Sequence, residues 1–305
     1  MISLVGYTGF VGSNIAAAGA FDGLYNSKNI ASAFGTNPDL LIYSGVRAEK
    51  FLANKFPRQD FDTVKEAFEN IGKINPKKLV LISTIDVYKR PVLVDECSEM
   101  DLNELHPYGL NRYLLEQMVQ TAGIDCLIIR LPGLFGTGIK KNFIYDMINL
   151  IPAALNEQKF AELSQKESSL QQYYSLDEYG FYKCRALADE EKTKLKAVFS
   201  EIGFTALNFT DSRAQFQFYN LAHLWADIQN AVAKNIKILN IATEPITASE
   251  LYYYLFGKEF LNEITDNPPV YDFRTNHADS FGGNDGYIQS KAEILEEIST
   301  FVSKF

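Results

Sequence analysis

The 305-residue chain has the composition of an ordinary soluble globular protein, with 47% hydrophobic and 22% charged residues. Its net charge of −9 argues against a nucleic-acid partner, and no apolar run approaches the ~18 residues that a membrane span needs. Three scattered cysteines, and a start without the features of a signal peptide, predict a reduced cytoplasmic protein; the histidines lack metal-ligand spacing.

The chain opens on a glycine-spaced loop. An apolar run at 2–5 predicts a buried parallel strand, and Gly6, Gly9 and Gly12 lead into a helix expected over 10–18. Glycines let the backbone turn tightly and approach a ligand, and the free N–H groups at a helix start attract phosphate. The segment therefore predicts a diphosphate site. Its assigned residues are Gly6, Thr8, Gly9, Phe10, Val11 and Gly12.

Strand and helix signals then alternate along the first part of the chain. Strands are predicted at 23–26, 39–44, 78–83 and 125–131, and helices at 59–73 and 108–122. This alternation is typical of an α/β fold with a Rossmann-like doubly wound parallel sheet. The path from the second strand to the third is too short for the usual helix–strand–helix. We therefore expect one strand of the sheet to be lost or rudimentary.

The remainder of the chain is more polar, and we expect it to supply a second domain. Helices are predicted near 141–151, at 189–202 and from 290, with an irregular aromatic stretch at 173–182. The simplest arrangement is a nucleotide-binding domain with a smaller, mostly helical substrate-binding lid. The nucleotide-binding domain is assigned to 1–137 with 206–240 returning to it, and the lid to 138–205 and 241–305.

Two further segments carry side chains suited to proton transfer. Thr84 directly follows the predicted strand 78–83, and strand carboxyl ends line the ligand crevice of a doubly wound sheet. Tyr108 and Arg112 lie four residues apart, on one helix face. A cation one turn from a phenol lowers the phenol pKa, which makes a tyrosine usable as a general acid or base. Alone, a hydroxyl after a strand is typical of a turn cap, and a tyrosine–arginine pair on a helix is typical of two side chains stacked at the surface. The order of these features after the glycine loop favours a catalytic site.

Together these motifs resemble the extended short-chain dehydrogenase/reductase family, the NAD(P)-dependent nucleotide-sugar epimerases and dehydratases, over nearly the whole chain. The resemblance implies that Thr84 and Tyr108 are catalytic, and that Arg112 holds the nicotinamide ribose and tunes the tyrosine. The further cofactor contacts that it implies are Ser44, Gly45, Tyr108, Arg112 and Pro132. The substrate contacts that it implies are Asp86, Gly133, Asn142, Arg213 and Arg274, of which the last three would bind a diphosphate.

Three departures from the family pattern bear on the activity. Arg112 stands where the family has lysine; it keeps the charge, but its fork is bulkier and planar. Ile85 replaces the first acid of the pair that the family's dehydratases carry, so only Asp86 remains, which weakens a dehydration mechanism. Gly133 replaces a common substrate-binding asparagine.

The choice of cofactor depends on the end of the second strand. NAD-binding proteins usually place an acid there for the adenosine ribose, whereas this chain has Asn26, Ser27 and Lys28. No carboxylate would repel a 2′-phosphate, and Ser27 and Lys28 could hold it. We therefore expect NADP ahead of NAD, with Lys28 as a merely solvated side chain the alternative.

The leading hypothesis is an enzyme that modifies a nucleotide-diphosphate sugar by hydride transfer at a hydroxyl-bearing carbon. We place an epimerase ahead of a reductase, and both ahead of a dehydratase. The alternative is a non-catalytic dinucleotide-binding sensor or scaffold, which the Arg112 replacement motivates. A homodimer through helices 59–73 and 108–122 is expected from the family resemblance, with no nucleic-acid or membrane partner and no metal.

Overall fold

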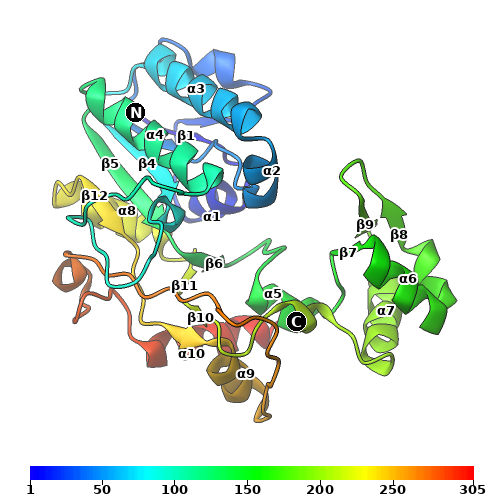
Figure 1. Ribbon diagram of the computed structural model, residues 1–305. Helices are drawn as coiled ribbons and strands as arrows, with labels where there is room; N and C mark the ends of the chain where they lie inside the picture. Colours follow the sequence, from blue (N-terminus) through cyan, green and yellow to red (C-terminus); the bar gives the residue numbers. More distant parts are fainter. The chain divides into compact units, whose positions relative to one another are not determined.

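Six parallel strands form the central sheet in the computed structural model, which describes residues 1–305 (Figure 1). The strand order is β12-β5-β4-β3-β1-β2. Its strands are β1 (Ile2–Val5), β2 (Gly23–Tyr25), β3 (Leu40–Tyr43), β4 (Leu79–Thr84), β5 (Cys126–Leu131) and β12 (Ile238–Asn240). The expected doubly wound parallel sheet is confirmed. In place of a further strand beyond β2, a 3₁₀ turn (Ile30–Ala33) carries the chain to β3, so β2 is the sheet edge.

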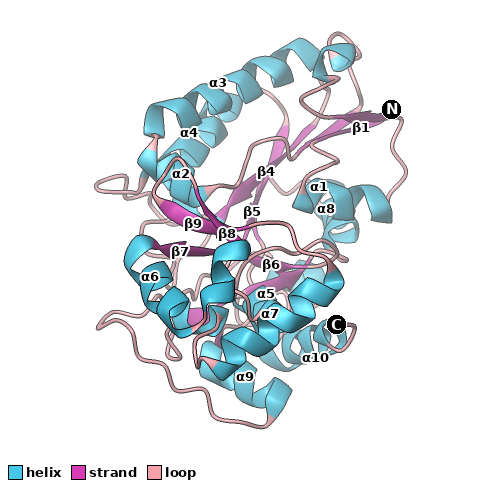
Figure 2. Ribbon diagram, turned by 90° about the vertical axis from the view of Figure 1, so that its right-hand side faces the viewer, coloured by secondary structure: helices cyan, strands magenta, loops and turns pink.

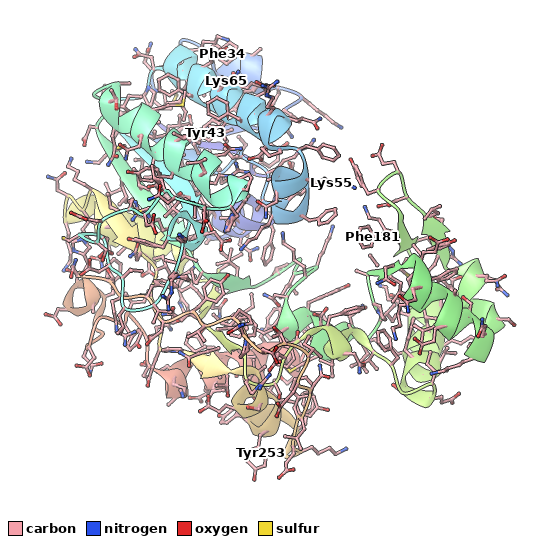
Figure 3. The ribbon with its side chains drawn as sticks, in the orientation of Figure 1. Phe34, Tyr43, Lys55, Lys65, Phe181 and Tyr253 are labelled. Carbon is pink, nitrogen blue, oxygen red and sulfur yellow. The ribbon has the colours of Figure 1, made fainter.

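Helices cover both faces of this sheet (Figure 2). They are α1 (Phe10–Ala18), α2 (Lys50–Lys55), α3 (Pro57–Ile74), α4 (Pro107–Thr121) and α8 (Leu224–Ala233). Apolar side chains of α1 and α8 pack on one face, with Ile15 and Trp225 among them. Those of α3 and α4 pack on the other, with Ile71 and Leu115 among them. Tyr43, labelled in Figure 3, belongs to the second face, and burial raises the pKa of its phenol to about 12.

The chain divides into two compact units. Unit 1 comprises Met1–Ile139, Gln215–Ile246 and Pro269–Ile298, and unit 2 comprises Lys140–Ala214, Thr247–Pro268 and Ser299–Phe305. The division differs from the expected bounds, because residues 241–246 and 269–298 lie in unit 1 and residues 206–214 lie in unit 2. Phe273 explains why residues 269–298 lie in unit 1, because it is fully buried and packs in one cluster with Ile85, Val87 and Tyr88. No sequence periodicity predicts its burial.

Unit 2 contains helices and a small antiparallel sheet. The sheet has the order β7-β9-β8, with β7 (Ala154–Asn156), β8 (Tyr174–Leu176) and β9 (Phe181–Cys184). The stretch expected to be irregular at 173–182 thus supplies most of a hairpin. The helices of this unit are α5 (Phe143–Asn149), α6 (Glu157–Lys166), α7 (Asp189–Glu201) and α9 (Ala248–Phe256). Leu163, Leu195 and Phe199 are fully buried in its own apolar core.

The remaining elements are short, apart from the last helix. They are β6 (Gly133–Phe135), β10 (Gln215–Phe216), β11 (Phe218–Asn220), β13 (Ile246–Thr247) and α10 (Lys291–Val302). The parallel pair β6 and β11 places Gly133 opposite Phe218. None of the helices combines the length and the apolar character that crossing a bilayer would require.

A buried ion pair ties α4 to the sheet. Arg130 on β5 donates through Nη2 to Glu116 Oε2 at 2.6 Å and through Nη1 to the Tyr88 hydroxyl at 2.6 Å. Both charged side chains are at most 4% exposed. Ser83 of β4 donates to the same carboxylate, so β4, β5 and α4 share one buried polar connection.

We expect Glu116→Ala to lower the free energy of unfolding by about 3–5 kcal/mol, because it leaves the buried guanidinium of Arg130 without its counter-charge. Urea unfolding followed by circular dichroism measures the change. Glu69→Ala, which removes an exposed pair with Lys73, is the control and should cost no more than about 0.5 kcal/mol. Equal losses in the two variants would contradict the role given to the buried pair.

Candidate active site

The glycine loop has no room for a side chain at positions 6 and 12. Gly6 has φ +90°, and the N–H of Gly9 donates to the Gly6 carbonyl at 2.9 Å. A Cβ at Gly12 would lie 2.1 Å from the Gly6 oxygen. Gly9 is the N-cap of α1, which has no side-chain cap bond and no acidic residue in its first turn. The positive helix end is therefore left for an anion, with Thr8 exposed beside it.

Two more predicted cofactor segments follow neighbouring strands. Ser44 comes directly after β3, and its hydroxyl donates to the Val5 carbonyl at 2.9 Å. A Cβ at Gly6 would lie 2.6 Å from the Ser44 oxygen, so the loops after β1 and β3 touch. After β2, the Asn26 side chain accepts from the N–H of Lys28 at 2.9 Å. Because β1, β2 and β3 are parallel and adjacent, these loops meet at the carboxyl ends of the three strands.

The turn after β2 offers exposed cation and hydroxyl groups. Ser27 and Lys28 are exposed, and residues 26–29 include no carboxylate. Asn29 fixes the turn from within, because its side chain accepts from the N–H of Asn26 at 2.7 Å and donates to the Leu24 carbonyl at 3.1 Å. The turn is therefore preformed, and its charge is positive.

Thr84 and Tyr108 meet at the carboxyl end of β4. Thr84 ends the strand, and its hydroxyl accepts from the N–H of Asp86 at 3.2 Å. Tyr108 lies in the first turn of α4, is 7% exposed, and is close enough to the Thr84 hydroxyl for that hydroxyl to lower the pKa of the phenol. The next residue, Gly109, makes this possible, because a Cβ there would lie 2.0 Å from the Asp86 oxygen. The two predicted catalytic hydroxyls are thus brought together.

The acidity of Tyr108 differs from the expectation. Burial raises the pKa of its phenol, and the charges of Asp86 and Asp60 raise it further. Arg112 and the Thr84 hydroxyl act in the opposite direction, as expected for a cation and a donor, but the pKa of Tyr108 is raised overall. In the protein alone the phenol is therefore protonated near neutral pH.

Arg112 is held by a carboxylate. Its Nη1 and Nη2 each donate to Asp60 at 2.9 Å, one to each oxygen, and Nη2 also donates to the Arg47 carbonyl at 2.6 Å. The guanidinium carbon lies 4.6 Å from the ring centre of Tyr108, and the residue is 5% exposed. Three of the five N–H groups of Arg112 are thus in use within the protein. Its contact with a ribose stays a prediction.

Asp86 gathers three side chains that sequence motifs did not single out for this site. Its Oδ1 accepts from Lys50 Nζ at 2.8 Å and from the Tyr271 hydroxyl at 3.3 Å, and His106 Nε2 lies 3.9 Å away. Lys50 and Tyr271 belong to no motif, so only the fold brings them here. His106 also caps α4, because its Nδ1 accepts from the N–H of Gly109 at 3.0 Å.

The predicted sugar-nucleotide contacts are distributed between the two units. In unit 1, Gly133 begins β6 directly after Pro132, and Arg274 pairs with Asp272 and stacks 3.9 Å from the ring centre of Tyr287. Nothing in these contacts tests binding of a diphosphate.

In unit 2, the predicted diphosphate contacts already have protein partners. The Asn142 side chain accepts from the N–H of Tyr145 at 3.2 Å and so caps α5. Arg213 donates to the two carboxylate oxygens of Asp211 through Nε and Nη2, each at 2.9 Å. Its Nη2 also donates to the Thr265 carbonyl at 2.6 Å. This pairing holds the pKa of Asp211 well below its usual range. A diphosphate at Arg213 would share the guanidinium with that carboxylate.

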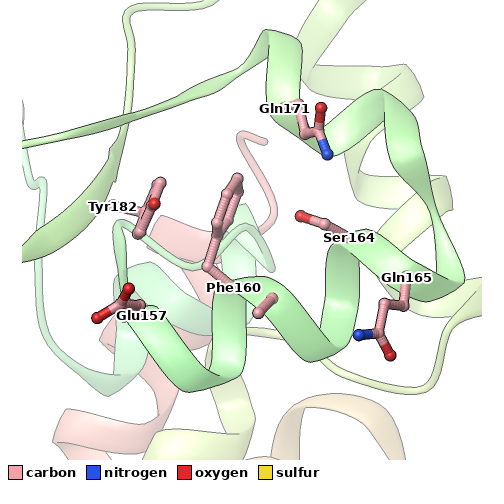
Figure 4. Close-up of a pocket in the computed structure, with 7 residues that line it drawn as sticks. Glu157, Phe160, Ser164, Gln165, Gln171 and Tyr182 are labelled. Carbon is pink, nitrogen blue, oxygen red and sulfur yellow. The ribbon is translucent and has the colours of Figure 1, made fainter.

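A pocket of about 310 Å³ lies within unit 2 (Figure 4). Phe160 and Tyr182 line it with their rings stacked at 3.9 Å between centres, and Ser164 extends from α6 toward the Phe160 ring. None of the predicted site residues lines this pocket.

Comparison with solved structures confirms the fold. A dTDP-4-dehydrorhamnose reductase from Bacillus anthracis in complex with NADP is 15% identical, with a TM-score of 0.64 over 100% of this chain and 98% of that one. The NAD-dependent NDP-hexosamine 5,6-dehydratase TunA is 12% identical, with a TM-score of 0.63 over 99% and 96%. A UDP-glucose 4-epimerase from Thermotoga maritima with UDP-glucose is 12% identical, with a TM-score of 0.62 over 99% and 97%. No family model and no curated protein matches the sequence.

We expect Gly109→Ala to lower the free energy of unfolding by about 1–3 kcal/mol, because its methyl group would overlap the Asp86 backbone and push α4 away. Thermal unfolding measures the change. Gly72→Ala in α3 is the control: its methyl group meets no atom within 4 Å, so the variant should gain up to about 1 kcal/mol in helix propensity. A Gly109→Ala variant as stable as the control would show that α4 does not need this contact.

Proposed function

We propose that the protein is an NAD(P)-dependent oxidoreductase that modifies a nucleotide-diphosphate sugar. One observation carries the proposal: Thr84 and Tyr108 meet at the carboxyl end of β4, two strands from the glycine loop after β1. Support comes from the fold, which this chain shares with a reductase, a dehydratase and an epimerase of nucleotide sugars. Each named enzyme acts on a sugar bound to a nucleotide.

The glycine loop fits a dinucleotide. Its backbone excludes side chains at positions 6 and 12, and the uncapped end of α1 favours the charge of a diphosphate. The adenosine ribose would lie at Asn26, Ser27 and Lys28, and the nicotinamide half would lie near Ser44, Gly45 and Pro132. A bound nicotinamide would supply the hydride acceptor or donor.

Side chains of the protein would transfer the proton of the sugar hydroxyl. Tyr108 holds or takes the proton of a sugar hydroxyl at its phenolic oxygen, while Thr84 donates to or accepts from the same hydroxyl and fixes its position. Burial of Tyr108 excludes water from that exchange. Asp86 and Gly133 would contact the sugar, and Arg112 the ribose of the cofactor.

Epimerisation is our leading form of the reaction, followed by reduction. An epimerase returns the hydride to the opposite face of the sugar, whereas a reductase consumes the cofactor. Dehydration is disfavoured because Ile85 occupies one acid position, and because the remaining acid, Asp86, is already paired with Lys50.

Asn142, Arg213 and Arg274 are the proposed contacts of the sugar-nucleotide diphosphate. Residues 138–205 and 241–305 are the proposed substrate-binding lid. We further propose a cytoplasmic homodimer joined through α3 and α4. Neither nucleic acid nor a membrane is a proposed partner, because the net charge of −9 opposes both anionic surfaces.

A non-catalytic dinucleotide sensor is the second candidate. The Arg112–Asp60 pair favours it, because a guanidinium in a carboxylate fork has fewer donors to offer a cofactor. The retained Thr84 and Tyr108 favour an enzyme, because a sensor needs neither hydroxyl.

A turnover panel distinguishes the two functions. The purified protein is incubated with UDP-, GDP-, dTDP- and CDP-sugars and with NAD or NADP in oxidised and reduced forms, and products are identified by NMR. We expect a new sugar signal that is lost in Tyr108→Phe, because the phenylalanine cannot carry the proton. If every sugar returned unchanged while the cofactor bound, the sensor function would replace the enzyme.

We expect Lys28→Ala to weaken NADPH binding by about tenfold or more, since a hydrogen bond to a charged group is worth about 1.5–3 kcal/mol. NADH, which has no 2′-phosphate, should bind as before. Isothermal titration calorimetry with both cofactors measures the difference, with Lys65→Ala as a control on the exposed face of α3 (Figure 3). An equal loss for NADPH and NADH would rule out a 2′-phosphate contact at Lys28.

A further inference from the structure

The Asp86 carboxylate needs a counter-charge because of where it lies. It follows Thr84 by two residues, its backbone touches Gly109, and its charge raises the pKa of Tyr108. Its side chain is 18% exposed, so solvent screens that charge only in part. An unpaired Asp86 would therefore act directly against ionisation of the phenol.

Lys50 is the one cation that pairs with Asp86 near neutral pH. Its Nζ lies 2.8 Å from Asp86 Oδ1. His106, at 3.9 Å, has its pKa lowered by burial and by the nearby ammonium of Lys50, so it is mostly neutral. Tyr271 is a neutral donor at 3.3 Å, with its pKa raised by burial.

The other charged residues around Tyr108 do not neutralise the Asp86 carboxylate. Arg112 stacks on the phenol ring, but Asp60 takes the fork of the guanidinium, and the charge of Asp60 itself raises the pKa of Tyr108. Burial opposes ionisation of the phenol most strongly, and Arg112 favours it. Asp86 is the carboxylate that opposes ionisation most, ahead of Asp60, so the cation paired with Asp86 bears on the phenol.

We propose that Lys50 is a positioning residue for the Thr84–Tyr108 pair: its ammonium holds the Asp86 carboxylate and offsets part of that carboxylate's charge at the phenol. The role rests on the proposed function, in which Tyr108 exchanges a proton with substrate. Lys50 comes from the short helix α2, and its side chain is 42% exposed. Solvent can therefore reach the pair from that side.

The test measures the ionisation of Tyr108 in the resting protein, without cofactor or substrate. The protein is made with a fluorinated tyrosine, whose more acidic phenol titrates while the fold is intact. The ¹⁹F signal of residue 108 is identified by its loss in Tyr108→Phe. Lys50→Met should raise the titration midpoint of Tyr108 by about one pH unit, the lower end of the effect of a close charge.

Matched variants separate this role from a general effect of the mutation. Lys50→Arg should keep the midpoint of the unsubstituted protein, and Lys50→Met with Asp86→Asn should return it there or below. Lys65→Met removes another lysine–aspartate pair, on α3, and should leave the midpoint unchanged. A Lys50→Met midpoint equal to that of the unsubstituted protein overturns the proposal, as does a failure of Asp86→Asn to reverse the shift.

Turnover supplies a second readout. With a sugar that the panel identifies, Lys50→Met should shift the pH profile of kcat upward by the same interval as the ¹⁹F midpoint, with KM unchanged. A loss through KM alone would assign Lys50 to substrate binding and overturn the proposal. If no sugar is turned over, the proposed function fails, but the ¹⁹F result still decides whether Lys50 controls the phenol.

Discussion

The close contact between the first turn of α4 and the backbone at residue 86 is the constraint on which the site depends. Only glycine fits at position 109, and the His106 side chain secures the same turn by accepting the Gly109 N–H. With that turn in place, Tyr108 reaches Thr84 at the end of β4. The carboxyl ends of parallel strands lie on one side of the sheet. The contact of α4 with residue 86 therefore also brings the phenol to the side that carries the glycine loop.

The electrostatics of the site follow from how two carboxylates are paired. Asp60 takes the fork of Arg112 and joins α3 to α4, so this cation serves the structure as well as the phenol. Asp86 is paired with the more exposed Lys50. Burial raises the pKa of Tyr108, and the two ion pairs limit how much the acids add to that effect. The resting protein therefore carries a protonated tyrosine whose ionisation depends on its neighbours.

The sheet and the position of Thr84 and Tyr108 were predictable from local patterns, whereas the ionic partners around them were not. Apolar runs such as 39–44 and 125–131 predict buried strands, and the candidate site is expected at the carboxyl ends of those strands. Lys50 and Asp60 lie 36 and 52 residues from their partners, and no sequence spacing connects them. Residues 269–289 have no periodicity either, and they join unit 1 because the buried Phe273 and the partly buried Tyr271 and Tyr287 pack there.

A crystal structure of the protein with NADP tests the central claim most directly, because it shows where a dinucleotide lies relative to Tyr108. We predict the diphosphate over the glycine loop, the adenosine ribose at Asn26–Lys28, and the nicotinamide C4 facing the Thr84–Tyr108 pair. A nicotinamide bound away from that pair, or a diphosphate held elsewhere, would contradict the account of this site as a redox centre.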